Sequence, residues 1–262
     1  MNDTPRLADT PFPLREKLLA TSAHLLMSAA AVGALLYLAI FVWYPDFLFE
    51  TDGGWQGLRI VVLVDLVLGP LLTFVVFKRG KKGLMTDLGC IGLLQFAALF
   101  GGAWVVYAER PLALVLHEGR LFSVTASDYE GVGEPVPDMR GLTEHAPHRA
   151  VLLPPDDPNV QSPIRTDYLG RKQFIYTHVP WMRPLAQHPD LLAAAAVPYA
   201  ELAAREAEED VEIVDAWLSA RGLTRETAYF VPYSSRFSLV FLGVRRADGA
   251  LLGALDLASY PD

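Results

Sequence analysis

The sequence predicts a membrane α-helical segment of three transmembrane helices, followed by an α+β domain with a small antiparallel sheet. The first observation is composition, because 52% of the 262 residues are hydrophobic, which is rare in a soluble protein of this length. The second is distribution, because the apolar residues are concentrated before Glu109. There they form three stretches, each long enough to cross a bilayer.

The three predicted spans cover about residues 22–44, 57–77 and 88–108, and a bilayer requires roughly 20 apolar residues. The first is not a cleaved signal peptide, because its apolar run is too long and no small-residue cleavage site follows. Trp43 and Tyr44 end it with aromatic side chains that are typical of a membrane interface. We therefore expect it to be a retained span.

Charged residues in the two short loops predict the orientation. The loop after the second span contains Lys78, Arg79, Lys81 and Lys82, whereas the loop after the first span contains only acidic charges. The positive-inside rule places the basic loop in the cytoplasm. In a bacterium, the expected parts are a cytoplasmic tail (1–21), three inner-membrane helices (22–108) and a periplasmic domain (109–262).

The net charge limits the partners of the periplasmic domain. The chain carries −8 at pH 7, and residues 1–108 contain equal numbers of acidic and basic side chains, so the excess lies after them. An acidic domain is not expected to bind nucleic acid. The single cysteine, Cys90, lies in the third span, so the periplasmic domain must fold without a disulfide.

Apolar runs and turn residues predict the elements of the periplasmic domain. Residues 111–127 indicate a hairpin that turns at Glu118-Gly119. Proline, glycine and aspartate are frequent in 128–163, which predicts mostly loop with one short strand at 150–153. Residues 173–180 are predicted to form another strand.

The last part of the chain predicts one helix and several strands. A proline at its start and an Arg-Gly pair at its end bound a helix over 198–223. Asp248-Gly249 is a hairpin turn between two apolar runs. A small antiparallel sheet covered by a helix gives the α+β class. The predicted strands cover 228–234, 237–246 and 250–259.

No sequence pattern predicts catalysis, a cofactor or a metal. His145 and His148 stand three positions apart, but Pro147 lies between them and zinc-type spacing is absent. Ser234 and Ser235 lie outside any nucleophile-elbow motif, and no glycine-rich phosphate loop follows a strand. We therefore expect a protein that is not an enzyme and uses no cofactor.

The second span contains an acidic residue, Asp65, and a helix breaker, Gly69-Pro70. A charge in hydrocarbon costs roughly 2.5–3.5 kcal/mol on insertion scales, so we expect a polar partner for it. Gln95 in the third span and Tyr37 in the first lie at a comparable depth, whereas His24 is expected too close to the inner face. The proline also frees the carbonyl four residues before it, which then needs another donor.

Two interpretations of these polar features stay open. Asp65 is either a satisfied structural carboxylate within the bundle or a docking point for a polar group on another transmembrane helix. The basic loop either only orients the protein or also contacts anionic lipid head groups and cytoplasmic parts of a partner assembly.

Two phrases carry a family resemblance, VDLVLGPLLT at 64–73 and FKRGKKGL at 77–84. With their surroundings, residues 22–110, they resemble the TfpX/TfpZ family of type IV pilin accessory proteins. The resemblance implies an inner-membrane chaperone or assembly protein that acts on the major pilin. Other inner-membrane pilus components and membrane lipid are further partners that it implies. Mature pilins carry a glutamate in an apolar helix, which makes a polar site at Asp65 a plausible place of contact.

Two other classes of protein stay open as alternatives. A membrane-anchored enzyme of unrecognised chemistry would show a titratable cluster in a deep periplasmic pocket. A periplasmic sensor would need an output region, and only a short tail and a short loop are expected in the cytoplasm. A pilin-directed accessory protein agrees better with this distribution of mass.

Overall fold

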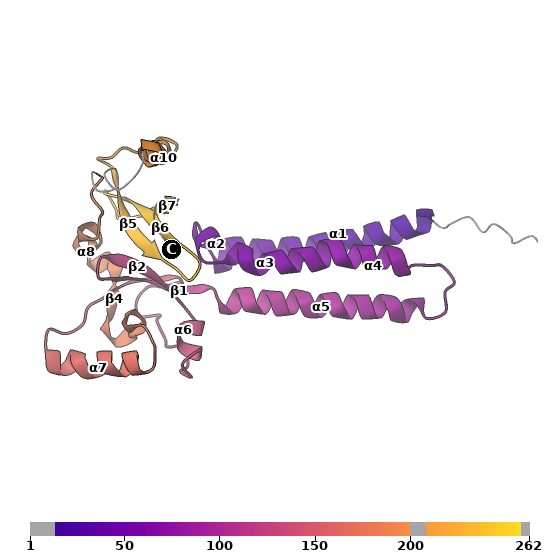
Figure 1. The fold of residues 1–262 in the computed structure, drawn as a ribbon, viewed down its shortest axis with the longest axis horizontal. Helices are drawn as coiled ribbons and strands as arrows, with labels where there is room; N and C mark the ends of the chain where they lie inside the picture. Colours follow the sequence, from indigo (N-terminus) through magenta and orange to yellow (C-terminus); the bar gives the residue numbers. More distant parts are fainter. Residues whose placement is uncertain (1–13, 200–207, 258–262) are drawn as a thin grey trace, which may run out of the picture. The chain divides into compact units, whose positions relative to one another are not determined.

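A computed structural model describes residues 14–199 and 208–257. The chain divides into two compact units. The first comprises Met1–Tyr37 and Gln56–Val105, and the second comprises Leu38–Trp55 and Val106–Asp262. Figure 1 labels most of the helices and strands of both units.

Three long helices cover Leu14–Trp43, Gly54–Val76 and Leu84–Ala108 (Figure 1). Each is long and apolar enough to cross a membrane. The prediction of three such helices is confirmed, although the first begins at Leu14 rather than near Ser22. Their segments are α1 (Leu14–Leu38), the π turn η1 (Ala39–Trp43), α3 (Gly54–Val62), the π turn η2 (Leu63–Leu68), α4 (Gly69–Val76) and α5 (Leu84–Ala108).

The connection between α4 and α5 carries the basic residues. Two of them are paired, Arg79 with Glu16 at 2.7 Å and Lys81 with Asp87 at 2.6 Å. All four side chains are substantially exposed, so solvent and salt weaken both ion pairs and they contribute little to stability.

The second unit is built on one seven-stranded sheet with the order β4-β3-β1-β2-β5-β6-β7 (Figure 1). The pairs β1–β3 and β2–β5 are parallel, and the other neighbours are antiparallel. The prediction of a small antiparallel sheet is therefore wrong, because long connections allow parallel pairing between distant strands. The strands are β1 (Pro111–His117), β2 (Arg120–Thr125), β3 (His148–Leu152), β4 (Met182–Pro184), β5 (Ala228–Ser234), β6 (Leu239–Arg245) and β7 (Leu251–Leu255).

Both predicted hairpins are confirmed. Strands β1 and β2 turn through Glu118 and Gly119, whose φ angles are 48° and 76°. Strands β6 and β7 are connected through Gly249, whose φ is 69°. Such positive φ values favour glycine, which explains its place in both turns. The strand predicted at 150–153 is also present, as part of β3.

Short helices replace some of the predicted loop and strand. The strand predicted at 173–180 is wrong, because two 3-10 turns lie there and Pro180 cannot donate to a strand ladder. The loop predicted over 128–163 ends early, because Asp157 accepts the Asn159 N–H at 2.9 Å and caps a helix. The helices and 3-10 turns of the second unit, apart from the segments of the long helices, are α2 (Leu48–Thr51), α6 (Ser127–Glu130), α7 (Pro158–Gly170), η3 (Ile175–Thr177), η4 (Val179–Trp181), η5 (Leu185–Gln187), α8 (Pro189–Ala194) and α10 (Glu208–Ser219).

Parts of three predictions lie outside the described residues. They are residues 1–13 of the cytoplasmic tail, 200–207 of the helix predicted over 198–223, and 258–259 of the last strand. The remainder of that helix contains α10, which packs Val214 and Leu218 against β5 and β6.

Candidate functional site: a polar groove in the first unit

The second apolar helix changes its hydrogen-bond pattern around Asp65. A π turn occupies Leu63–Leu68, and in such a turn a backbone N–H reaches the carbonyl five residues earlier. The Gly69 N–H follows this pattern by donating to the Val64 carbonyl. In the same pattern, residue 70 would donate to the Asp65 carbonyl, but residue 70 is a proline and has no N–H. The backbone carbonyl of Asp65 therefore needs a donor from elsewhere.

Gln95 on α5 supplies that donor. Its Nε2 lies 3.4 Å from the Asp65 carbonyl oxygen and 3.3 Å from Asp65 Oδ1. Both residues are buried, with Gln95 8% and Asp65 4% exposed. Gly69 permits the approach, because a Cβ at this position would overlap the Gln95 amide. One side-chain amide thus contacts both the acidic side chain and the helix defect.

The second carboxyl oxygen of Asp65 is buried without a partner. Within the part of the chain that the structure describes, Asp65 Oδ2 makes no hydrogen bond. A buried polar group that lacks a partner costs about 1–3 kcal/mol, and more when it is charged. The first unit therefore satisfies only half of this carboxyl group.

A groove of about 510 Å³ lies between α1 and α5, and Asp65 is part of its lining. The residues from α1 are mostly small, whereas those from α5 are apolar except for Gly92 and Gln95. Each set extends over about three helical turns, or roughly 16 Å. These lining residues include Ala20, Ala23, Ser28 and Ala31 on α1, and Leu88, Gly92, Phe96 and Leu99 on α5.

His24 and Thr73 add two polar groups to the same groove. His24 Nδ1 lies 2.7 Å from Thr73 Oγ1. The sequence placed His24 too close to the inner face to approach Asp65, yet both line one groove. The reason is that α1 already begins at Leu14, which places His24 about 15 Å inside the helix.

The structure brings most of the predicted polar residues together. Asp65, Gly69, Pro70 and Gln95 meet at the π turn. Tyr37 is 62% exposed and is not among the residues that line the groove. The basic residues Lys78, Arg79, Lys81 and Lys82 do not line it either.

Sequence reasoning missed Thr73 as part of this site. It follows Gly69 by four positions and Asp65 by eight, so all three share one face of the helix. This spacing was the available signal for Thr73. The contact with His24 had no such signal, because it depends on how far α1 extends.

A second buried carboxylate, Asp52, lies in the second unit. Its Oδ2 accepts hydrogen bonds from Thr51 Oγ1 at 2.6 Å and from the Tyr233 hydroxyl at 2.6 Å. Burial raises the pKa of Asp52, and burial together with this neighbouring carboxyl group raises the pKa of Tyr233. The Tyr233 hydroxyl therefore keeps its proton and donates to Asp52.

The turn between β5 and β6 binds the segment that contains Asp52. The hydroxyls of Ser235 and Ser238 both donate to the Thr51 carbonyl, at 2.6 and 2.9 Å. Phe237 covers Gly53, where a Cβ would overlap the aromatic ring. These contacts hold α2 and the residues after it in place within the second unit.

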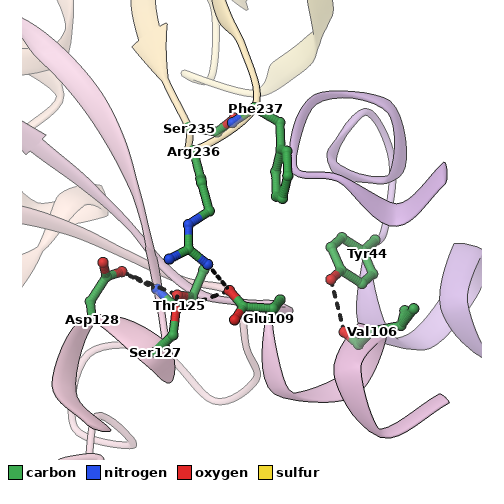
Figure 2. A network of polar contacts seen from close by, with 9 residues as sticks. All are labelled: Tyr44, Val106, Glu109, Thr125, Ser127, Asp128, Ser235, Arg236 and Phe237. Carbon is green, nitrogen blue, oxygen red and sulfur yellow. Dashed lines mark hydrogen bonds and ion pairs between the residues drawn. The ribbon is translucent and has the colours of Figure 1, made fainter. Parts of the chain in front are cut away.

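Figure 2 shows a neighbouring network around the same turn. Arg236 donates to Glu109 Oε2 at 2.7 Å, and Ser127 donates to the same oxygen at 2.9 Å. Tyr44 donates to the Val106 carbonyl at 2.8 Å. These contacts join segments that are far apart in the sequence, and their donors and acceptors are matched, which indicates a structural role.

No metal-binding group of three or more His, Cys, Asp or Glu occurs within 14–199 and 208–257. His148 is buried and lies 2.9 Å from the Thr143 hydroxyl. The two histidines that the sequence singled out thus do not form part of such a group.

Comparisons with known proteins find relatives that are named fimbrial assembly proteins. No family model matches the sequence, and no solved structure matches it. The fimbrial assembly protein of Dichelobacter nodosus serogroup I is 24% identical over 251 residues, covering 90% of this chain and 93% of that protein.

Two further fimbrial assembly proteins of Dichelobacter nodosus match a shorter region. The protein of serogroups C1 and C2 is 32% identical over 94 residues, which are 35% of this chain and 72% of the relative. The serogroup E1 protein is 33% identical over 94 residues, which are 35% of this chain and 37% of the relative. By this likeness, the chain belongs to the family of fimbrial assembly proteins.

Proposed function

We propose that this protein supports type IV pilus assembly at the inner membrane by acting on the major pilin. The likeness to a fimbrial assembly protein over 90% of the chain carries the proposal. The resemblance of residues 22–110 to TfpX/TfpZ proteins supports the narrower assignment to pilin accessory proteins.

The proposed action is that of a chaperone, which keeps the pilin stable or promotes its entry into the pilus. A pilin subunit waiting in a membrane presents an apolar helix and a head outside the bilayer. The three apolar helices offer surfaces for the former, and the sheet-containing unit offers one for the latter. This role requires no catalytic step and no cofactor.

Deletion of the gene is the first test of this role. We expect fewer surface pili and less major pilin at unchanged pilin transcript, and we expect the full-length chain to restore both. Electron microscopy and immunoblotting of whole cells and sheared fractions would measure these quantities. Normal pilin and normal piliation in the deletion strain would refute the proposed function.

The proposed topology places the basic loop in the cytoplasm and the second unit in the periplasm. Its test uses single cysteines in a Cys90→Ser background, introduced by Lys82→Cys or Leu169→Cys. Both positions are exposed, and Leu169 is 79% exposed. A membrane-impermeant maleimide should label only the latter in intact spheroplasts, and both after lysis. The reverse labelling would show the opposite orientation.

A further inference from the structure

We infer that the groove between α1 and α5 is a docking slot for one transmembrane helix of a partner, which presents a donor–acceptor side chain to Asp65 and His24. The identification of this partner as the major pilin rests on the proposed function. The slot itself rests on the geometry of the first unit.

The unpartnered oxygen of Asp65 is the first argument for an occupant. Asp65 is 4% exposed and lines the groove, yet its Oδ2 makes no hydrogen bond within the described residues. In hydrocarbon no water compensates for the missing bond. A lipid tail in the groove would leave the oxygen unsatisfied as well, because it has no donor. A helix with a polar side chain would supply one.

His24 defines which polar side chains would suit the slot. Its Nδ1 is engaged by Thr73 at 2.7 Å, so Nε2 is the ring atom available to a ligand. Asp65 Oδ2 lacks a hydrogen-bond donor among the described residues. His24 Nε2 donates or accepts according to the tautomer of the ring. A side chain that both donates and accepts meets both requirements. Amides, hydroxyls and protonated carboxyl groups have this chemistry.

The shape of the groove suits a helix. Its lining extends over about three turns on each side, roughly 16 Å. Small residues on α1, including Ala20, Ala23 and Ala31, allow a second backbone to approach closely, as at other helix interfaces in membranes. Gly92 on α5 faces open space, because a Cβ there would meet no atom within 4 Å.

A second copy of the chain is a poorer occupant. Symmetric pairing of two such grooves would place the same surface on both sides of the interface. It would therefore bring one Asp65 toward the other, and one of the two carboxyl groups would have to bind a proton before they could pair. An amide or a hydroxyl on a helix from a different protein can donate to Asp65 without this requirement.

Site-specific photocrosslinking of the full chain in native membranes tests the slot. Met27 and Phe96 line the groove and are 69% and 59% exposed. Leu26 and Leu93 on the same helices are 72% and 70% exposed but do not line it, which makes them matched controls. We expect pilin adducts, identified by immunoblot and mass spectrometry, at the two groove positions and not at the controls.

Two glycine variants test whether the space itself is needed. Gly92→Leu would fill the groove, whereas Gly89→Leu adds the same side chain to the same helix outside it, and neither Cβ would meet an atom within 4 Å. We expect the first to lose the pilin adduct and the second to retain it, with both proteins inserted equally. Retention in both variants would overturn the slot.

Variants of Asp65 test the polar part of the inference. Asp65→Leu removes the acceptor and is expected to lose the adduct at Met27, whereas Asp65→Asn keeps a donor and an acceptor and is expected to retain more of it. An unchanged adduct in Asp65→Leu would overturn recognition through this residue.

The remaining outcomes separate the slot from the proposed function. Groove adducts with only lipid, or with only a second copy, would overturn the slot. A further probe is placed at Phe174 of the second unit, which is 59% exposed. If this probe captures pilin and the groove probes do not, the slot is overturned but the function in pilus assembly stands. Absence of pilin adducts at every probe, with normal piliation after deletion, would overturn both.

Discussion

Asp52 and Asp65 are both buried carboxyl groups, 3% and 4% exposed, but their surroundings differ. In the second unit, Asp52 Oδ2 accepts two hydrogen bonds at 2.6 Å. In the first unit, Asp65 Oδ1 receives one longer contact at 3.3 Å, and Oδ2 receives none within the described residues. The second unit therefore supplies two donors to the carboxyl group of Asp52, whereas one carboxyl oxygen of Asp65 lacks a partner among the described residues and Asp65 lies beside a groove.

This difference indicates a structural role for Asp52 and a role in binding a partner for Asp65. A buried acid with all its partners supplied by the same unit holds that unit together. A buried acid with an open atom stores an unfavourable free energy that a partner can relieve. The following changes would break or sharpen this contrast.

The largest effect is expected from Asp52→Ala. The substitution removes the carboxyl oxygen to which the buried hydroxyl groups of Thr51 and Tyr233 both donate. We therefore expect the free energy of unfolding to fall by about 3 kcal/mol. Thermal unfolding and limited proteolysis of the full chain in detergent would measure this loss. Glu50→Ala, an exposed change in the same short helix, should stay within about 0.5 kcal/mol. Equal stability of the two variants would contradict the structural role of Asp52.

A smaller loss is expected from Gly69→Ala. The added Cβ would overlap the Gln95 amide, so either the amide or the helix must shift, at about 1–3 kcal/mol. Gly92→Ala adds a Cβ in open space and should be neutral or stabilising, because alanine is the better helix former by about 1 kcal/mol. Unfolding of both variants in a denaturing detergent titration would give their difference. A tolerated alanine at Gly69 would show that the Asp65–Gln95 contact does not depend on close approach.

The sequence predicted features that depend on local patterns or on the membrane. Bilayer thickness limits the depth at which polar groups can pair, and this led to Gln95 as a partner of Asp65. The β1–β2 and β6–β7 hairpins followed from their turn residues. The proline also indicated a freed carbonyl, but four residues back, whereas the π turn moves the unsatisfied carbonyl to Asp65 itself.

Contacts between distant segments were beyond sequence reasoning. Asp52 and Tyr233 are separated by 181 positions, and neither residue type nor spacing indicates their pairing. The parallel pairs β1–β3 and β2–β5 depend in the same way on where long connections return. His24 was misplaced because the amino-terminal end of α1 extends beyond the most apolar stretch, and helix ends are poorly marked by hydropathy.

The pH dependence of stability should differ between wild type and Asp52→Asn. Burial raises the pKa of Asp52 in the folded state above the usual value of about 3.9. The folded state then binds more protons than the unfolded state, so wild-type stability falls as pH rises from about 4 through the folded pKa, and this effect is constant above it. The Tm of wild type minus that of the variant should decrease over this window. A difference that rises with pH would contradict the raised pKa.

The smallest effect on stability is expected from Asp65→Leu. Oδ2 contributes no hydrogen bond that could be lost, and polar contacts between membrane helices average only about 0.6 kcal/mol. Replacement of a poorly paired buried acid by an apolar side chain is often neutral or stabilising. We therefore expect the free energy of unfolding to change by less than about 1 kcal/mol while capture of the pilin is lost. If Asp65→Leu instead destabilises the protein as much as Asp52→Ala, both acids are structural, and the open oxygen of Asp65 marks no binding site.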